Sequence, residues 1–249
     1  MSLSNPTTSQ NPATKFIHFK GETGRWVYWD KQQEKEVEIK PPIYFIPIDD
    51  LSTIKGWSDK HKSGIYSNEV HYLNDEPLTV KSFDGDLFIQ GLYEKIKYEI
   101  KAKGGKFAKS IYAMMFDQSG KKELVNFQFY GASLSPYMDL KYKRDSGVII
   151  GIEKELLDAK NGDNEFKVPV LKKYNRKEDL IDAAIEMDRI LQDYLEKYKS
   201  KKENDAVEKS ESYEPTQDMR EEYLAAQNQE QPPTPEPPAD DDPNAELPF

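Results

Sequence analysis

The segment 110–130 reads SIYAMMFDQSGKKELVNFQFY. Two runs rich in apolar, aromatic and β-branched residues, Ser110–Asp117 and Glu123–Tyr130, flank the polar sequence QSGKK at 118–122. Such residues favour strands, and a short polar segment that contains glycine is typical of a hairpin turn. The segment therefore predicts two paired antiparallel strands in a mainly β domain.

Further strand signals lie on both sides of this hairpin, each bounded by glycine, proline or polar residues. They are 25–29, 37–40, 43–48, 78–83, 87–90, and a last hairpin of 147–157 and 165–173 around Asn161-Gly162-Asp163. Residues 51–76 are polar and punctuated by glycine, which predicts a long loop with a short helix at most. Loops of this length inside a compact domain are often functional.

Three segments are candidate helices. Residues 92–103 repeat apolar side chains at spacings of both two and four, so strand and helix both fit, and we expect the helix. Residues 133–141 fit a helical turn or a short helix. Residues 176–199 place an apolar stripe at helical spacing, from Leu180 to Tyr198. This stripe fits a helix that covers an open side of the β domain, and a helix that binds a partner is the alternative.

The net charge of −10 conceals two parts of different character. Residues 203–249 contain fourteen acidic and two basic residues, a net charge of −12, whereas residues 1–202 carry +2. The tail is also rich in proline and poor in apolar residues, so it cannot offset the entropy of ordering a chain. We expect a flexible arm at 1–14, one folded domain at 15–202 and a disordered acidic tail at 203–249.

Several classes of site are excluded or disfavoured by composition. The chain contains no cysteine, which excludes disulfides and thiolate zinc sites. His18, His61 and His71 lack the spacing of metal ligands, and no cofactor motif is present. No apolar run approaches the ~20 residues that span a bilayer, and residues 1–14 do not resemble a signal peptide. We expect no membrane association and a cytoplasmic location.

Basic and aromatic residues are interleaved in three places. Single-stranded DNA binding requires cations that follow phosphates and flat rings that stack on bases. For each residue, core packing of the ring or ordinary solvation of the cation is the alternative. The predicted DNA-binding residues are Arg25, Trp26 and Trp29; Lys103, Lys106, Phe107, Lys109 and Tyr112; and Lys141, Lys143 and Arg144.

The last ten residues, DDDPNAELPF, combine a carboxylate cluster with an apolar end. Such a segment is suited to docking into basic pockets of other proteins, and a generic solvated acidic tail is the alternative. The predicted docking residues are Asp240, Asp241, Asp242, Leu247, Pro248 and Phe249.

This tip resembles that of bacterial and phage single-stranded DNA-binding proteins, which run Asp-Asp-Asp-hydrophobic-Pro-Phe. Here the sequence PNAEL separates the three aspartates from Pro248 and Phe249. The segment 104–141, with KFAKSIYA at 106–113 and GASL at 131–134, is similar to phage-encoded members. The resemblance implies an antiparallel oligonucleotide-binding (OB) barrel with helical insertions and a C-terminal helix. It further implies a non-enzymatic role in DNA replication, recombination or repair, in the host cytoplasm, with partners recruited by the tip.

The body is longer than the compact bacterial barrel and adds a C-terminal helix, so the resemblance does not imply a tetramer. Two other functions are open from the sequence. A metal-dependent nuclease could use the carboxylates at Asp49-Asp50 or Asp84-Gly85-Asp86, although aspartates at strand ends commonly serve turns. An adaptor protein without nucleic-acid affinity is the other. Salt-sensitive oligonucleotide binding and divalent-dependent strand cleavage would separate the three.

Overall fold

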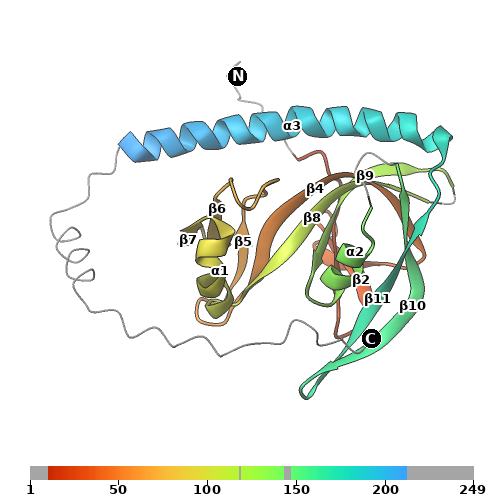
Figure 1. Ribbon diagram of the computed structural model, residues 1–249, viewed down its shortest axis with the longest axis horizontal. Coiled ribbons are helices and arrows are strands. Elements are labelled where there is room, and N and C mark those ends of the chain that lie inside the picture. The colour runs from red at the N-terminus through yellow and green to blue at the C-terminus, as the bar shows by residue number, and fades with distance from the viewer. Residues whose placement is uncertain (1–10, 118, 143–146, 212–249) are drawn as a thin grey trace, which may run out of the picture. The chain divides into compact units, whose positions relative to one another are not determined.

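The computed structural model describes residues 11–117, 119–142 and 147–211, with side chains as far as residue 198 (Figure 1). The chain divides after Lys199 into two units. The sheet, the cores and the candidate site all belong to the first unit. Lys143, Arg144 and the predicted docking residues 240–242 and 247–249 lie outside the described residues.

The fold is mainly β, as the sequence predicts. Its strands are β1 Phe16–Lys20, β2 Arg25–Asp30, β3 Lys35–Ile39, β4 Ile43–Ser58, β5 Ser63–Ser67, β6 Leu78–Ser82, β7 Leu87–Gly91, β8 Gly105–Phe116, β9 Lys122–Tyr130, β10 Ile149–Asn161 and β11 Asn164–Tyr174. The central hairpin forms as expected, with Phe116 opposite Lys122 and Ala108 opposite Tyr130. The last hairpin also forms, and both of its strands are longer than predicted.

The described strands form one mixed sheet in the order β3-β2-β1-β9-β8-β4-β5-β6-β7. β10 pairs with the start of β4 and with β11. β1 runs parallel to β9, with Ile17 opposite Phe127, so the sheet is not wholly antiparallel. Among the described residues the strand pairs do not close into a ring, because β9 and β11 are not paired.

The prediction of a long loop at 51–76 is wrong. β4 continues to Ser58 and β5 follows at Ser63–Ser67, so much of this segment is strand. Its polar residues misled the prediction because several are buried and satisfied inside the sheet. The hydroxyl of Thr53 lies 3.1 Å from that of Ser67, which also accepts a hydrogen bond from the Ile54 amide at 2.9 Å.

The predicted helices are present. Residues 92–103 contain helix α1 (Tyr93–Ala102), which packs Ile96 and Ile100 against β4 to β7. A 3-10 turn, η1 (Gly131–Ser133), and α2 (Leu134–Asp139) follow β9. α3 (Glu178–Glu211) is longer than expected. Its apolar stripe buries Leu180, Ala184, Leu191 and Leu195 against the sheet, which confirms the covering role.

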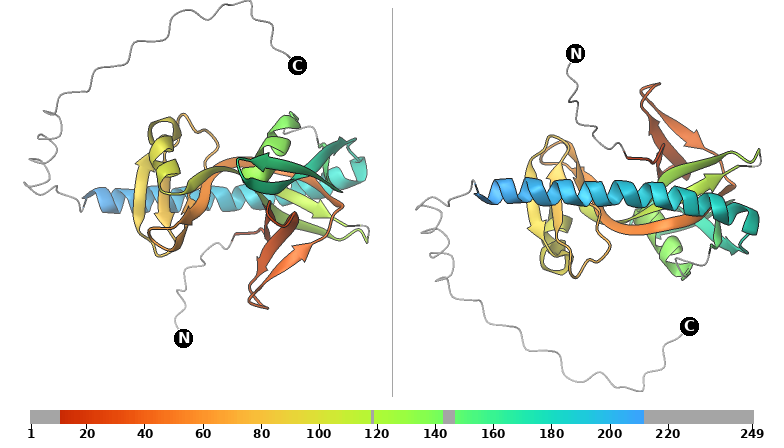
Figure 2. Two further views of the ribbon diagram at one scale, coloured as in Figure 1. Left: turned by 90° about the horizontal axis from the view of Figure 1, so that it is seen from below. Right: turned by 90° about the horizontal axis from the view of Figure 1, so that it is seen from above.

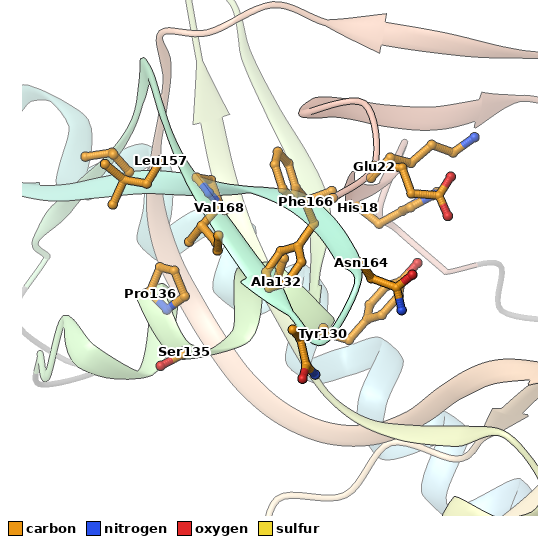
Figure 3. A pocket seen from close by; sticks show the side chains of 18 of the residues that line it. His18, Glu22, Tyr130, Ala132, Ser135, Pro136, Leu157, Asn164, Phe166 and Val168 are labelled. Atoms are coloured by element: carbon orange, nitrogen blue, oxygen red, sulfur yellow. The ribbon is translucent and has the colours of Figure 1, made fainter.

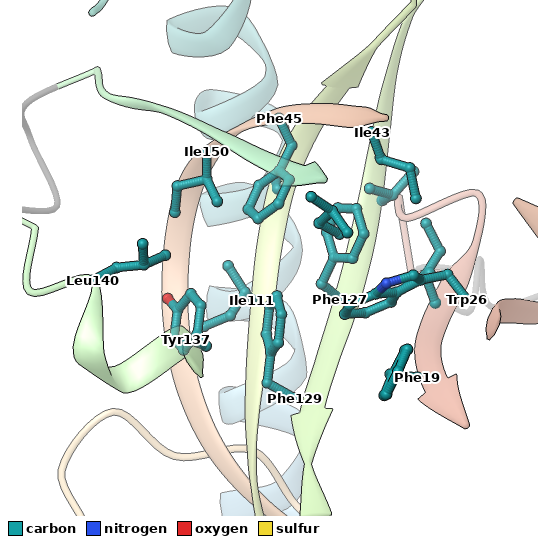
Figure 4. Close-up of a cluster of buried hydrophobic side chains, with 14 residues drawn as sticks. Phe19, Trp26, Ile43, Phe45, Ile111, Phe127, Phe129, Tyr137, Leu140 and Ile150 are labelled. Carbon is teal, nitrogen blue, oxygen red and sulfur yellow. The ribbon is translucent and has the colours of Figure 1, made fainter. Parts of the chain in front are cut away.

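The main core lies between the curved sheet, β10 and α2 (Figure 4). Phe45 stacks on Phe127 at 4.4 Å, and Phe129 stacks on Tyr137 of α2 at 4.3 Å between ring centroids. A second core lies under α1 around Ile54 and Val80. At the chain start, Thr14 of the predicted arm donates its amide to Leu124 O at 2.9 Å, and Ala13 is buried.

Candidate nucleic-acid interface

Three glycines bring the end of β4 against the turn between α1 and β8. A Cβ on Gly56 would lie 2.3 Å from Gly104 O, and one on Gly104 would lie 2.2 Å from Trp57 O. Gly104 also has φ +91°, a left-handed conformation that favours glycine. These backbones touch because no side chain intervenes, and the contact places Trp57 beside the turn that holds Lys103 and Lys106.

Trp57 is exposed by 54% near the end of β4, between the half-buried Gly56 and the buried Ser58. In the turn after β4 the ring of His61 lies 4.7 Å from that of Phe88 on β7, and Lys103 Nζ lies 5.6 Å from the Phe88 ring. The turn after β4 adds two exposed lysines. We call this surface the Trp57 patch; it consists of Trp57, Lys60, His61, Lys62, Phe88, Lys103 and Lys106.

The patch is positively charged. Its four lysines are exposed, and among the described residues none of them forms an ion pair. Asp59 is the carboxylate in the same turn as Lys60 and Lys62. An exposed indole next to uncompensated ammonium groups is able to stack on a flat ligand while the cations hold phosphates.

A groove of about 1580 Å³ adjoins the patch and shares Lys106 with it (Figure 3). One wall is formed by η1 and α2, with Ala132 and Pro136, and the other by β11, with Phe166 and Val168. At its end, His18 of β1 and Tyr130 of β9 stack with their centroids 6.1 Å apart.

Burial shifts the pKa of both stacked side chains, His18 and Tyr130. It lowers the pKa of His18 below its ordinary value, an effect that Glu36 opposes and that Lys20 and Lys55 reinforce. His18 is therefore neutral near pH 7. Burial and the charge of Glu36 raise the pKa of the Tyr130 hydroxyl. Both rings are thus uncharged stacking groups at neutral pH.

Charge is unevenly distributed around the groove. The cations Lys20 and Lys106 lie on β1 and β8, and Lys20 pairs with Glu36 at 2.5 Å. The carboxylates that line the groove lie on the β1–β2 turn, on α2 and near the tip of the β10–β11 hairpin. They are Glu22, Asp139, Asp163 and Glu165. Of these two cations, Lys106 on β8 forms no ion pair among the described residues, so a polyanion entering the groove would meet its positive charge on the β8 side.

Two predicted DNA-binding rings are buried, which corrects the sequence interpretation. Trp26 is 0% exposed and packs edge-on against Phe129 at 5.7 Å in the main core. Tyr112 is also fully buried under α3, and its hydroxyl donates to Glu69 at 2.9 Å. Burial raises the pKa of Tyr112. Neither ring offers a face to a base.

The other predicted DNA-binding residues lie in different parts of the structure. Lys103 and Lys106 belong to the Trp57 patch. Lys109 is tied to Asp50 by an ion pair of 2.8 Å, and Phe107 packs 5.4 Å from the ring of Tyr93. Three further predicted residues are exposed outside the patch: Arg25, which lies 3.8 Å from Glu38; Trp29; and Lys141.

The sequence interpretation missed Trp57, Lys60, Lys62, His18 and Tyr130. For the first three a signal was present, because residues 56–62 read GWSDKHK and interleave an aromatic residue with cations beside a glycine. The segment was assigned to a long loop, so its part in the surface was not recognised. His18 and Tyr130 meet only through the parallel pairing of β1 with β9.

Two of the carboxylates considered for a metal, those of Asp49 and Asp50, have structural partners. Asp49 Oδ2 lies 2.9 Å from His71 Nε2, and Asp50 accepts from Lys109 and from the Tyr137 hydroxyl at 3.2 Å. Asp84 and Asp86 lie in the β6–β7 turn, where the Asp86 amide donates to Ser82 Oγ. Within the described ranges no group of three or more histidines and carboxylates could hold a metal ion.

Comparison with known proteins does not identify the chain: no family model matches it, and neither do the curated proteins or the solved structures. Of the helices in the described residues, none combines the length and apolar character needed to cross a bilayer.

Proposed function

We propose that this protein is a non-enzymatic, sequence-tolerant binder of single-stranded DNA. The observation that carries the proposal is the Trp57 patch, in which an exposed indole near the end of β4 accompanies four exposed lysines, on the following turn and around the start of β8, that form no ion pairs among the described residues. Single strands expose both phosphates and base faces, and every base can stack on an aromatic ring. Duplex DNA hides its base faces, so the patch favours single strands.

The strand connections support an OB-like core for this proposal. β4 pairs with β8 and β10, β8 pairs with β9, and β10 pairs with β11. With α2 between β9 and β10, these pairings resemble those of a five-stranded Greek-key barrel, except that among the described residues β9 pairs with β1 and not with β11. OB folds bind oligonucleotides on the face of strands 2 and 3, between the loops that join strands 1–2 and 4–5. Here strands 2 and 3 correspond to β8 and β9. The loop between strands 1 and 2 corresponds to the segment 59–104, and the loop between strands 4 and 5 corresponds to the turn at 162–163.

The acidic tail is assigned a second role in the same proposal. We propose that residues 240–242 and 247–249 dock onto replication or recombination proteins of a phage-infected cell, in its cytoplasm. The support is the sequence: carboxylates followed by Leu247, Pro248 and Phe249 suit a basic pocket with an apolar floor. The body would hold unwound strands while the tail recruits enzymes to them.

Titration of a fluorescent oligo-dT tests the body's role. Lys103→Gln/Lys106→Gln should weaken binding several-fold, because two phosphate contacts are lost. The matched control is Lys172→Gln/Lys173→Gln, which neutralises two exposed lysines on β11. Equal affinity of both double variants would refute the patch as the binding surface. Absence of binding would favour an adaptor protein, and strand cleavage with Mg²⁺ would favour a nuclease.

A further inference from the structure

The β10–β11 hairpin consists of two parts with a bend between them. Its base belongs to the sheet, because Ile150–Ile152 pair with both β4 and β11. Beyond Ile152 the register shifts: Ile152 faces Leu171 and Leu156 faces Pro169, so residues 153–155 face Val170 alone. A bulge of this kind bends a hairpin, and Pro169 cannot donate a backbone hydrogen bond there.

The part beyond the bulge, residues 156–168, is here called the strap. Within the described chain its strand pairing is confined to the hairpin itself. The Lys167 amide donates to Gly21 O at 2.7 Å, which ties the strap to the β1–β2 turn. Leu156 also rests against Gly24, where a Cβ would lie 2.6 Å from Leu156 Cδ1. The strap is thus joined to the sheet at its base, where Leu156 packs against the main core, and is held at the β1–β2 turn by the Gly21 contact.

The groove runs beneath this strap, between it and the wall formed by η1 and α2. Leu157, Phe166 and Val168 of the strap line the groove. Because the base joins the sheet and the Gly21 contact joins β1, the closed strap bounds the groove on its outer side. A long polymer without a free end that is to lie beneath the strap must pass the end of the strap held at Gly21, so this contact would have to open to admit it.

We propose that the strap is a clamp that opens to admit a single DNA strand into the groove and then closes over it. This inference rests on the proposed function. The strand would pass from the Trp57 patch through Lys106, which both surfaces share, to the stacked rings of His18 and Tyr130. The carboxylates of Asp163 and Glu165 on the strap repel phosphates, so the phosphates follow β8 at Lys106 and the bases face the strap.

A disulfide across the Gly21 contact tests the clamp. A Cβ on Gly21 would lie 3.7 Å from Phe166 Cβ, within the ~3.5–4.5 Å range of disulfides. The chain contains no cysteine, so Gly21→Cys/Phe166→Cys can form no other intramolecular pair. The control is Gly21→Cys/Ala132→Cys, with a Cβ separation of 3.3 Å, which joins the turn to η1 and leaves the strap free.

Each variant is loaded in its reduced form on closed circular single-stranded DNA or on the same sequence made linear. It is then oxidised and washed with high salt. We expect the Gly21–Phe166 disulfide to retain protein on circles, to lose it from linear DNA, and to release it from circles on reduction. Oxidation before loading should prevent salt-resistant retention on circles, although the Trp57 patch stays free to bind at low salt. The control should be lost from both DNAs. Equal loss of the strap-locked variant from both would overturn the clamp.

The outcomes separate the clamp from the proposed function. If the wild-type chain binds single strands and trapping fails, the clamp is refuted and the function stands. If the wild-type chain binds no single strands, both fail. Where the disulfide does not form, hydrogen exchange on the wild-type chain decides. Oligo-dT should slow exchange in residues 156–168 more than in the hairpin base at 149–152, and unchanged exchange in the strap would refute the clamp.

Discussion

At the residue scale, exposure separates tryptophans that the sequence cannot distinguish. Trp26 and Trp57 both lie on strands, and both are near glycine and cations. Trp26 faces the main core, whereas the indole of Trp57 is 54% exposed near the end of β4, where Gly56 lies against the backbone of Gly104. The two residues therefore serve as a matched pair for separating binding from folding.

Trp57→Ala should weaken oligo-dT binding by about 1–3 kcal/mol, the usual worth of a base-stacking ring. Its thermal melting temperature should stay close to wild type, because the indole is 54% exposed. Trp26→Ala should instead cost about 3–5 kcal/mol of stability through the cavity it leaves. Fluorescence titrations and thermal melts measure both effects. A folded Trp57→Ala protein with full affinity would remove Trp57 from the interface.

His18 predicts a pH dependence of folding. Its pKa is lowered in the folded state by burial, so below pH ~6.5 the unfolded chain binds more protons at this residue. The free energy of unfolding should thus fall as the pH drops below ~6.5, by at most about 1.4 kcal/mol per pH unit from this group. Urea melts of wild type and His18→Gln between pH 5 and 8 check this. An identical pH slope in both proteins would contradict the assignment.

At the element scale, α3 covers one face of the sheet. Substitutions on its buried and exposed sides should therefore lower the free energy of unfolding by different amounts. Leu191 is fully buried against β4 and β8, whereas its neighbour Ile190 is 44% exposed. Leu191→Ala should lower the free energy of unfolding by about 2–5 kcal/mol. Ile190→Ala should change it by about 0.5 kcal/mol or less. Chemical denaturation measures both, and equal losses would argue against this packing.

Elements with a clear hydrophobic periodicity could be predicted from sequence, and elements governed by tertiary contacts could not. The hairpin at 110–130 and the stripe of α3 have periodicities that one packed face produces. β4 beyond Leu51 escaped prediction because Ser52, Thr53 and Ser67 are buried and satisfy one another. For the site, Lys103 and Lys106 were recognised from local composition. Trp57 and the His18–Tyr130 pair depend on contacts between distant segments, which local composition does not encode.

At the scale of the whole molecule, charge is divided between a near-neutral body and an acidic tail. Residues 212–249 contain ten acidic residues and one arginine, a net charge of −9. A tethered anion competes with DNA for basic groups, most strongly at low salt where screening is weak. Deleting residues 212–249, which leaves α3 whole, should tighten oligo-dT binding at low salt and have little effect at high salt.

The docking role of the tail needs a separate variant. Phe249→Ala keeps every charge, so DNA affinity should be unchanged while capture of partner proteins is lost. Pull-downs from infected cells, run beside DNA titrations, test this division. Recovery of the same proteins with and without Phe249 would show that the apolar end does not dock.

The central claim is that cations of the body bind the phosphates of single strands while rings bind the bases. The most direct measurement is the salt dependence of affinity for oligo-dT and for the matching duplex. Log affinity for the single strand should fall linearly with log salt, by about 0.7 for each phosphate neutralised, and Lys103→Gln/Lys106→Gln should reduce the slope by roughly 1.4. Salt-independent binding, or equal affinity for the duplex, would contradict the account.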